Sequence, residues 1–329
     1  MELNDFSNKT LYGIKSDTAR HFWIGYSIFV LVSSFVGDTT ILIASIRYNA
    51  FKLHKLIVVI IQHIAVCDLI VSCVSVFPRV VSLMADGWVL GTPLCYILPI
   101  MTYYSATVAI ILICCMTACK LLILNYPFRL QTLSEKHAHA GCTVIWVSVV
   151  SLPVIIILAD PNDVKFTYKS YGCDFGYSAP VWSWLRPVLA TIYLFVPSIF
   201  VVVSTVCLLV LAYKVAHKSH ESLKWQGVTT TILVALAYCI STLPYCIYHF
   251  TESSIEDQSS FFHNEFTRIS YFCLLLNTIS NFYIYCLTVP SFRKFLWLQI
   301  QKQLPFRRKS GGDDMNMPGT QVSMLVTVS

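Results

Sequence analysis

The chain has 329 residues and a formal net charge of +6, with 56% hydrophobic but only 12% charged residues, and its mean hydropathy is +0.66. A protein surface in water needs more charge than this, so the composition excludes a soluble protein of one or two domains and indicates a membrane protein. The net positive charge is explained by basic loops on one side of a bilayer and by lipid headgroups, and it predicts no nucleic-acid partner.

Seven apolar stretches are long enough to cross a bilayer as helices. A hydrocarbon core about 30 Å thick needs roughly 20 mainly apolar residues per helix, and the spanning backbone must satisfy its own hydrogen bonds. The segment before the first stretch lacks the basic region of a signal peptide, so we expect the first stretch to be retained as a helix. The predicted spans are residues 22–46, 56–84, 95–124, 141–159, 184–212, 226–250 and 266–288.

The distribution of basic residues predicts the orientation. Lys and Arg gather in the loops after the first and fifth spans and in the segment after the seventh, whereas the loop after the sixth span is acidic. Cytoplasmic loops carry the excess of Lys and Arg, so the amino terminus is predicted outside and the carboxyl terminus inside, as in a multi-pass plasma-membrane protein. Asn8, in the triplet Asn8-Lys9-Thr10, then falls on the side where asparagines are glycosylated.

Four regions follow from this reading. We expect an extracellular segment at 1–21, a seven-helix bundle at 22–288, an amphipathic juxtamembrane helix at 289–303 and a flexible cytoplasmic tail at 304–329. In the third region, the residues after Pro290 put aromatic side chains on one face and basic ones on the other, as helices lying on a membrane surface do. The tail carries Ser and Thr residues that kinases could modify.

The cysteines divide into two groups. Eleven of the 13 lie inside the apolar stretches or at their inner ends, where a thiol usually serves as a small core side chain. Cys95 and Cys173 alone fall in extracellular loops. Because the exterior is oxidising, we expect a disulfide between them, which ties the top of the third span to the loop after the fourth.

Two carboxylates fall in the middle of predicted spans, Asp38 in the first and Asp68 in the second. A carboxylate at this depth is costly, so each needs a partner, a cation or a proton. Prolines inside the spans remove a backbone hydrogen bond and bend the helix, and such bends favour a cavity between the outer halves of the helices. Among these prolines are Pro78, Pro153, Pro197 and Pro244.

Several landmarks together carry a family resemblance. They are Asp68 in the run Ala-Val-Cys-Asp-Leu, the spacing from Trp88 to Cys95, Trp146, Cys173, Pro197, Pro244, and the run Asn281-Phe282-Tyr283-Ile284-Tyr285 before a short amphipathic helix. In this order and spacing the chain resembles a rhodopsin-like (class A) G-protein-coupled receptor over about residues 20 to 303. The resemblance implies an all-α seven-transmembrane bundle, an extracellular ligand and a heterotrimeric G protein as partner, with arrestin and a receptor kinase as further partners.

The chain departs from this family at the positions that switch it between states. The Asp-Arg-Tyr that usually ends the third helix reads Cys119-Lys120-Leu121, and the Asn-Pro-x-x-Tyr of the seventh helix lacks its proline between Asn281 and Tyr285. The inner tyrosine of the fifth helix is replaced by Thr205, the tryptophan two residues before Pro244 by Thr242, and the asparagine of the first helix by Asp38. The fold does not depend on these positions, but coupling does.

The family's ionic lock cannot form here. Lys120 lacks the planar fork of an arginine, Cys119 supplies no carboxylate, and Lys224 stands near the foot of the sixth helix. Two outcomes stay open. Either the inactive state is weakly held, so that the receptor signals without ligand, or the contact with the G protein is weakened and coupling is poor.

In the family fold, Asp38 and Asp68 face each other, with Asn277 and Asn281 nearby and Ser105 on the third helix. Two carboxylates in a dry site do not both ionise, so the pair would hold one shared proton or a cation such as a sodium ion at Asp68. The alternative is that a protonated Asp38 replaces the family's asparagine as a hydrogen-bond donor. We expect no other cofactor and no metal centre.

The same resemblance places six residues in a ligand pocket, and aromatic bodies with polar tips suit an amphipathic molecule. Each of them could instead be a packing residue. Arg79 and Arg186 could attract a carboxylate or extend to the headgroups, so that a peptide and a lipid-like acid both stay open. Thr102 and Leu275 stand where aminergic receptors and opsins carry their acid and their lysine, which disfavours amines and retinal. The six residues are Thr102, Tyr103, Tyr193, Tyr245, His249 and Tyr271.

The sequence also bears on three other functional classes. An enzyme is disfavoured, and no catalytic residue is assigned, because the chain lacks zinc-ligand spacing and a glycine-rich phosphate loop. A transporter or channel would also place carboxylates in the membrane, but it would predict internal repeats that the sequence does not contain. A receptor-like protein that binds ligand without signalling, as a scavenger or a partner, is the third alternative.

Overall fold

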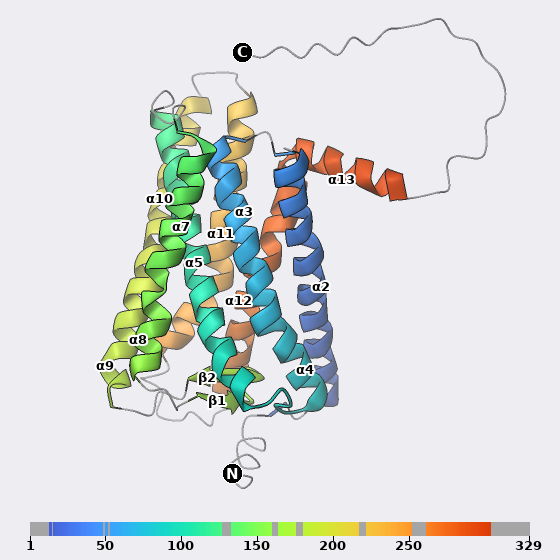
Figure 1. The fold of residues 1–329 in the computed structure, drawn as a ribbon, viewed down its shortest axis with the longest axis vertical. Helices are drawn as coiled ribbons and strands as arrows, with labels where there is room; N and C mark the ends of the chain where they lie inside the picture. The colour runs from blue at the N-terminus through green and yellow to red at the C-terminus, as the bar shows by residue number, and fades with distance from the viewer. Residues whose placement is uncertain are drawn as a thin grey trace, which may run out of the picture.

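The computed structural model describes residues 13–14, 16–48, 50–51, 53–126, 133–159, 164–175, 180–216, 222–251 and 261–303. Within these residues, seven helices are long and apolar enough to cross a membrane. They stand side by side in one bundle (Figure 1). The predicted seven-helix fold is therefore confirmed.

The spans occur where the hydropathy placed them, and several are broken into consecutive pieces. The first three are α2 (Asp17–Tyr48), then α3 (Lys55–Val71) with η1 (Ser72–Val76) and α4 (Phe77–Ala85), and α5 (Thr92–Asn125). The next two are α7 (Glu135–Val149) with α8 (Ser151–Ala159), and α9 (Trp182–Ala190) with η2 (Thr191–Phe195) and α10 (Val196–Ala216). The last two are α11 (Ser222–Thr251) and α12 (Phe261–Thr288), followed by α13 (Pro290–Gln303).

The breaks in these helices lie next to prolines. Segments η1 and η2 are π-helical turns of five residues, and they end just before Pro78 and Pro197 respectively. A proline has no N–H and its ring clashes with the carbonyl four residues earlier, and a wider π turn relieves this conflict. The interruption between α7 and α8 similarly precedes Pro153. These local distortions change the direction of side chains in the outer half of the bundle.

Helix α5 is the central element. It contacts α3, α7, α8, α10, α11 and both strands. Its buried face includes Val108, Leu112 and Met116, which belong to the largest hydrophobic cluster of the protein. Many large apolar side chains point outward instead, among them Val144 and Leu287. Such an apolar exterior suits a surrounding lipid phase and not water.

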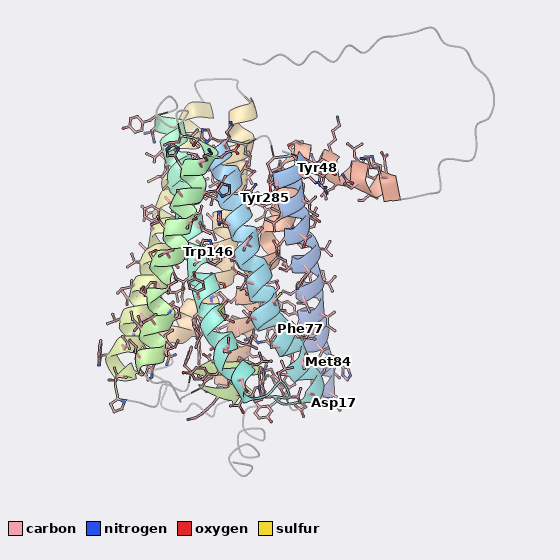
Figure 2. The ribbon with its side chains drawn as sticks, viewed as in Figure 1. Asp17, Tyr48, Phe77, Met84, Trp146 and Tyr285 are labelled. Carbon is pink, nitrogen blue, oxygen red and sulfur yellow. A yellow bond between two sulfur atoms is a disulfide. The ribbon has the colours of Figure 1, made fainter. Side chains whose placement is uncertain are left out.

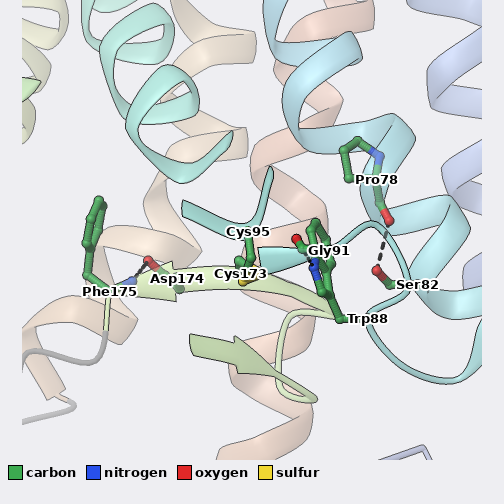
Figure 3. Close-up of a disulfide and its surroundings, with 8 residues drawn as sticks. All are labelled: Pro78, Ser82, Trp88, Gly91, Cys95, Cys173, Asp174 and Phe175. Carbon is green, nitrogen blue, oxygen red and sulfur yellow. Dashed lines mark hydrogen bonds between the residues drawn. A yellow bond between two sulfur atoms is a disulfide. The ribbon is translucent and has the colours of Figure 1, made fainter. Parts of the chain in front are cut away.

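A β-hairpin lies across one end of the bundle (Figure 1). Its strands, β1 (Val164–Thr167) and β2 (Gly172–Phe175), pair antiparallel with Phe166 opposite Cys173. No strand was expected from the sequence, so the hairpin is a feature that the predicted all-α bundle did not include. The predicted disulfide between Cys95 and Cys173 is present, with 5.2 Å between the two Cα atoms (Figure 3). Cys95 lies in the first turn of α5 and not in the preceding loop.

The two ends of the bundle differ in kind. Asp17 lies at the end covered by the hairpin and Tyr48 at the opposite end (Figure 2). Helix α13 leaves the bundle at the Tyr48 end and runs across the helix axes (Figure 1). Its Phe292 stacks on Phe51 with ring centroids 4.9 Å apart, while Arg293 is exposed. By the charge rule above, the hairpin end is the extracellular one and α13 lies on the cytoplasmic side.

Candidate functional site

The outer half of the bundle encloses a cavity of about 220 Å³. Its wall is formed by residues of α3, η1, α4, α5, β2, α8, α9, η2, α11 and α12. Five of the six residues assigned to the ligand pocket line this one cavity: Thr102, Tyr103, Tyr193, Tyr245 and Tyr271. The sixth, His249, belongs to α11, but its side chain lies outside the described residues. The structure thus brings the assigned residues together from four different helical segments.

The polar groups of these residues are not equally available. The Thr102 hydroxyl donates to the carbonyl of Leu98, 2.8 Å away, within its own helix. The Tyr193 hydroxyl lies 3.0 Å from the Ser151 hydroxyl on α8. Tyr245 packs edge-to-face on Tyr271, with ring centroids 5.4 Å apart. These residues therefore shape the wall, and the charged chemistry comes from other side chains.

Asp174 on β2 is the residue that the sequence analysis missed. Its carboxylate accepts hydrogen bonds from the hydroxyls of Tyr271, at 2.7 Å, and Tyr103, at 3.1 Å. It also accepts a bond from the backbone N–H of Phe175 at 2.8 Å (Figure 3). A loop carboxylate thus joins α5 to α12 across the cavity. Burial raises the pKa of Asp174 above its usual value, and the tyrosine hydrogen bonds partly oppose that rise.

One signal in the sequence could have identified Asp174. It directly follows Cys173, and the disulfide fixes Cys173 at the top of α5. The neighbouring side chain must then lie close to the outer part of α5, where Tyr103 stands. The connection to Tyr271 could not be found in this way, because it depends on how α12 packs.

Arg79 on α4 faces the cavity and does not extend to the headgroups. Its Nε donates to the carbonyl of Ser170 at 2.6 Å, and its Nη1 lies 3.4 Å from the Ser75 hydroxyl. The guanidinium carbon stands 5.8 Å from the centre of the Tyr271 ring. Arg186 on α9 also lines the cavity. Of the two readings left open for Arg79, the structure favours the one in which its charge serves the pocket.

At its inner end, away from the hairpin, the cavity reaches Asp68 and Asn277. Asn281 on α12 donates from Nδ2 to Oδ2 of Asp68 at 2.9 Å. Asp68 also interacts electrostatically with Asp38 on α2. The predicted proximity of the two carboxylates and the two asparagines is therefore what the structure contains.

Asp38 has its own hydrogen-bond chain. Ser34, one turn earlier on α2, donates to Oδ2 of Asp38 at 2.6 Å, and Ser72 in η1 donates to the Ser34 hydroxyl at 2.6 Å. The chain joins the first span to the π turn of the second. It uses only one oxygen of the Asp38 carboxyl group.

Four buried polar atoms of this region have no hydrogen-bond partner among the described residues. They are Oδ1 of Asp38, Oδ1 of Asn281, the hydroxyl of Tyr285 and the hydroxyl of Ser105. Buried polar groups normally have partners, so each unpaired atom requires an explanation. Oxygen atoms are the ligands that hard cations prefer, so the unpaired Oδ1 atoms of Asp38 and Asn281 are of the chemical type that a sodium ion would need. Within the described residues, no cluster of three or more His, Cys, Asp or Glu could hold a metal ion.

At the inner end, Lys120 is buried and only 7% exposed. Within the part of the chain that the structure describes, no acidic side chain forms an ion pair with it. It lies near His54, whose ring accepts a hydrogen bond from the backbone of Leu56 at the start of α3. Burial lowers the pKa of His54, and the positive charge of Lys120 lowers it further. The side chain of Lys224 lies outside the described residues.

The other switch positions occupy ordinary packing sites. Thr205 donates its hydroxyl to the carbonyl of Val201 at 2.7 Å, and Thr242 lines the cavity. Tyr285 packs edge-to-face against Phe51, with centroids 5.3 Å apart. Cys119 and Leu121, on either side of Lys120, are half-buried, and Pro244 lies inside α11. Asn8 and residues 304–329 lie outside the described residues.

Comparison with known proteins gives a consistent result. The family described as 7 transmembrane receptor (rhodopsin family) matches residues 37–285. The chain is similar to the C-X-C chemokine receptor type 2 of Oryctolagus cuniculus, with 22% identity over 231 residues that cover 69% of this chain and 62% of that receptor. It is also similar to the G-protein coupled receptor 68 of Homo sapiens, with 23% identity over 257 residues that cover 73% and 66%. The chain thus spans less than two thirds of the length of either relative.

Proposed function

Because the chain belongs to the rhodopsin family of seven-transmembrane receptors and is a multi-pass protein of the plasma membrane, we propose that it transmits an extracellular ligand signal to a heterotrimeric G protein. The ligand would be a peptide, a lipid-like acid or another small non-aminergic molecule. The family is a receptor family and not an enzymatic one, so we assign no catalytic residue.

One observation carries this proposal: a single cavity runs from the extracellular hairpin to the middle of the membrane. Its outer wall includes Asp174 and its deepest part includes Asp68. Asp68 is bonded to Asn281, one helical turn before Tyr285 on α12. A ligand that changes the contacts of the wall can therefore favour one arrangement of α12, and a receptor needs such differential binding to shift its population.

The inner end supports coupling with raised basal activity. Lys120 keeps a positive charge at the position of the family's arginine, but no acidic partner among the described residues holds it. An inactive state that no ion pair stabilises is populated less, so a smaller contribution from a ligand is enough to populate the active state. We also propose a sodium ion at Asp68, and arrestin and a receptor kinase as partners, the last two by family membership alone. Membrane lipids surround the apolar exterior.

The test is nucleotide exchange on purified G proteins by the full chain in lipid nanodiscs. We expect exchange above the level of empty nanodiscs before any ligand is added, and a change in that level for the variant Lys120→Ala. Equal, background-level exchange by both, with or without ligand, would contradict the proposed basal activity. Ligand capture with no exchange by any G-protein class would indicate the non-signalling alternative, and ion flux through proteoliposomes would indicate a transporter.

A further inference from the structure

Among the described residues, the outer wall of the cavity holds an excess of positive charge. Arg79 and Arg186 line it, and Asp174 is the one carboxylate among the described residues of its outer wall. Both arginines interact electrostatically with Asp174. With Asp174 ionised, the outer wall carries one net positive charge, and protonation of Asp174 would increase it.

The charge of Arg79 is not neutralised by direct contact. Among the described residues, its hydrogen bonds end on the carbonyl of Ser170 and the hydroxyl of Ser75, and neither of these is an anion. The side chain is only 8% exposed. A buried guanidinium without a directly paired anion is costly, since burial disfavours the charged form, and the Tyr271 ring and the more distant charge of Asp174 offset that cost only in part. The site is therefore complementary to an anion that the cavity can admit.

Gly172 leaves one edge of the guanidinium accessible. A Cβ atom at this glycine would stand 3.3 Å from Nη2 of Arg79, and both residues line the cavity. Within the described part of the chain, Nη2 makes no hydrogen bond. An arginine with free N–H groups binds a carboxylate strongly and with defined geometry.

The carboxylate of Asp174 in the outer wall is a poor site for a cation. The three hydrogen bonds of Asp174, from Tyr103, Tyr271 and Phe175, already use both of its oxygens. A ligand amine would have to displace one of these donors. The electrostatics of the outer wall therefore favour an anionic ligand over a cationic one.

The remaining wall is mainly apolar. It includes Leu98, Ile110, Leu152, Ile156, Leu189 and Leu194. Pockets of this kind bind apolar bodies, while a few polar groups fix the orientation of the ligand. Strand β2 lines the cavity at the end of the bundle that the hairpin covers (Figure 1), which favours a small molecule over a long peptide.

Resting on the proposed receptor function, we infer that the outer part of the cavity binds an amphipathic organic acid whose carboxylate contacts Arg79, with Arg186 as a second positive charge, and whose apolar body packs against the apolar part of the wall. Asp174 takes no part in binding the acid directly. It holds Tyr103 and Tyr271 in place, and its negative charge limits how strongly an anion is bound.

Three probes that share one body test the inference: 8-phenyloctanoic acid, 8-phenyloctanamide and 8-phenyloctylamine. Binding of the tritiated acid to the full chain in nanodiscs is measured, with empty nanodiscs as the blank, and the amide and amine compete with it. We expect the acid to bind at least about ten-fold more tightly than the amide, because a hydrogen bond to a charged group contributes more than one between neutral groups. The amine should compete least.

Two variants and one control locate the site. Arg79→Gln should weaken binding of the acid by roughly ten- to a hundred-fold. Gly172→Ala should also weaken it, because the new Cβ crowds Nη2 while the charge of Arg79 stays. Arg20→Gln should leave it unchanged, since Arg20 pairs with Asp86 at 3.4 Å and does not line the cavity. Gly172→Ala guards against the possibility that Arg79→Gln simply misfolds.

The outcomes separate the two proposals. Binding of the acid without nucleotide exchange would support this inference and count against coupling. Nucleotide exchange driven by the amine would support coupling and count against this inference. Equal affinity for all three probes, no binding of the acid, or the same affinity in the wild type, Arg79→Gln and Gly172→Ala would overturn the inference.

Discussion

Asn281 on α12 donates a hydrogen bond to Asp68 on α3, with 2.9 Å between Nδ2 and Oδ2, although the two residues are 213 positions apart in the chain. The carboxylate is at the floor of the cavity that opens toward the hairpin. The bond therefore connects the ligand cavity to the helix that carries Tyr285. This polar centre lies between the hairpin at the extracellular end and Lys120 at the cytoplasmic end.

Asp38→Asn should leave the fold intact and reduce the sodium and pH sensitivity of basal exchange. The unpaired Oδ1 atom of Asp38 is buried, and an amide cannot share a proton or balance a cation with Asp68. The measurement is basal nucleotide exchange against sodium concentration and pH. Ser34→Ala is the matched control, because it removes the hydroxyl bonded to Oδ2 but keeps both carboxylates. Unchanged sensitivity would mean that Asp38 acts only as a hydrogen-bonding group.

Tyr103→Phe and Tyr271→Phe should each destabilise the protein by roughly 1–3 kcal/mol, since each removes a hydrogen bond to a buried carboxylate. Both hydroxyls donate to Asp174, so the two effects should not be additive. Thermal unfolding of the single and double variants measures this. Tyr96→Phe is the control, because the Tyr96 hydroxyl makes no hydrogen bond within the described residues. If the double variant lost as much stability as the two single variants together, the two hydrogen bonds would be independent of each other.

Asp174 should make the stability of the protein depend on pH. Burial raises its pKa above the usual 3.8, so the folded state binds the proton more tightly than the unfolded state. The stabilisation from this proton is complete below pH 3.8 and is lost as the pH rises through the folded-state pKa. As the pH rises from 3.8 through the folded-state pKa, the wild type should lose this stabilisation while Asp174→Asn does not. The unfolding temperature of the variant should therefore increase relative to that of the wild type. A constant difference from pH 4 to pH 7 would contradict the prediction.

Lys120→Met should raise the pKa of His54. The low pKa of His54 is caused mainly by burial, which the substitution keeps, and next by the charge of Lys120, which the substitution removes. We therefore expect a partial return toward 6.5, and no complete one. Hydrogen–deuterium exchange at the imidazole C2 position, followed against pH, gives this value. Lys214→Met, on an exposed part of α10, should leave it unchanged.

Cys95→Ala or Cys173→Ala should destabilise the receptor by about 2–5 kcal/mol, the usual effect of losing a native disulfide. The bridge closes a chain segment with a sequence separation of 78 residues, and it fixes the strand that carries Asp174. Both thermal stability and binding of the acid probe should fall together. Cys207→Ala removes an exposed free thiol and serves as the control. Loss of stability with full binding would show that the hairpin positions itself without the bridge.

Much of the fold could be predicted from the sequence because the bilayer permits few solutions. A spanning backbone must be helical, so apolar length alone located the seven helices. The placement of Cys95 and Cys173 on the extracellular side identified the disulfide. Five of the six residues assigned to the pocket line one cavity. The hairpin carried no comparable signal, since four-residue strands are too short to show a period.

The sequence by itself determined which segments cross the membrane, their orientation and the disulfide, because hydrophobicity, charge and redox environment act locally along the chain. Only the tertiary structure decided that Asp174 joins Tyr103 and Tyr271, which lie 71 and 97 positions away. It also decided that Arg79 faces inward. Side-chain direction depends on π turns and on helix packing, and both are set by contacts between residues far apart in the chain.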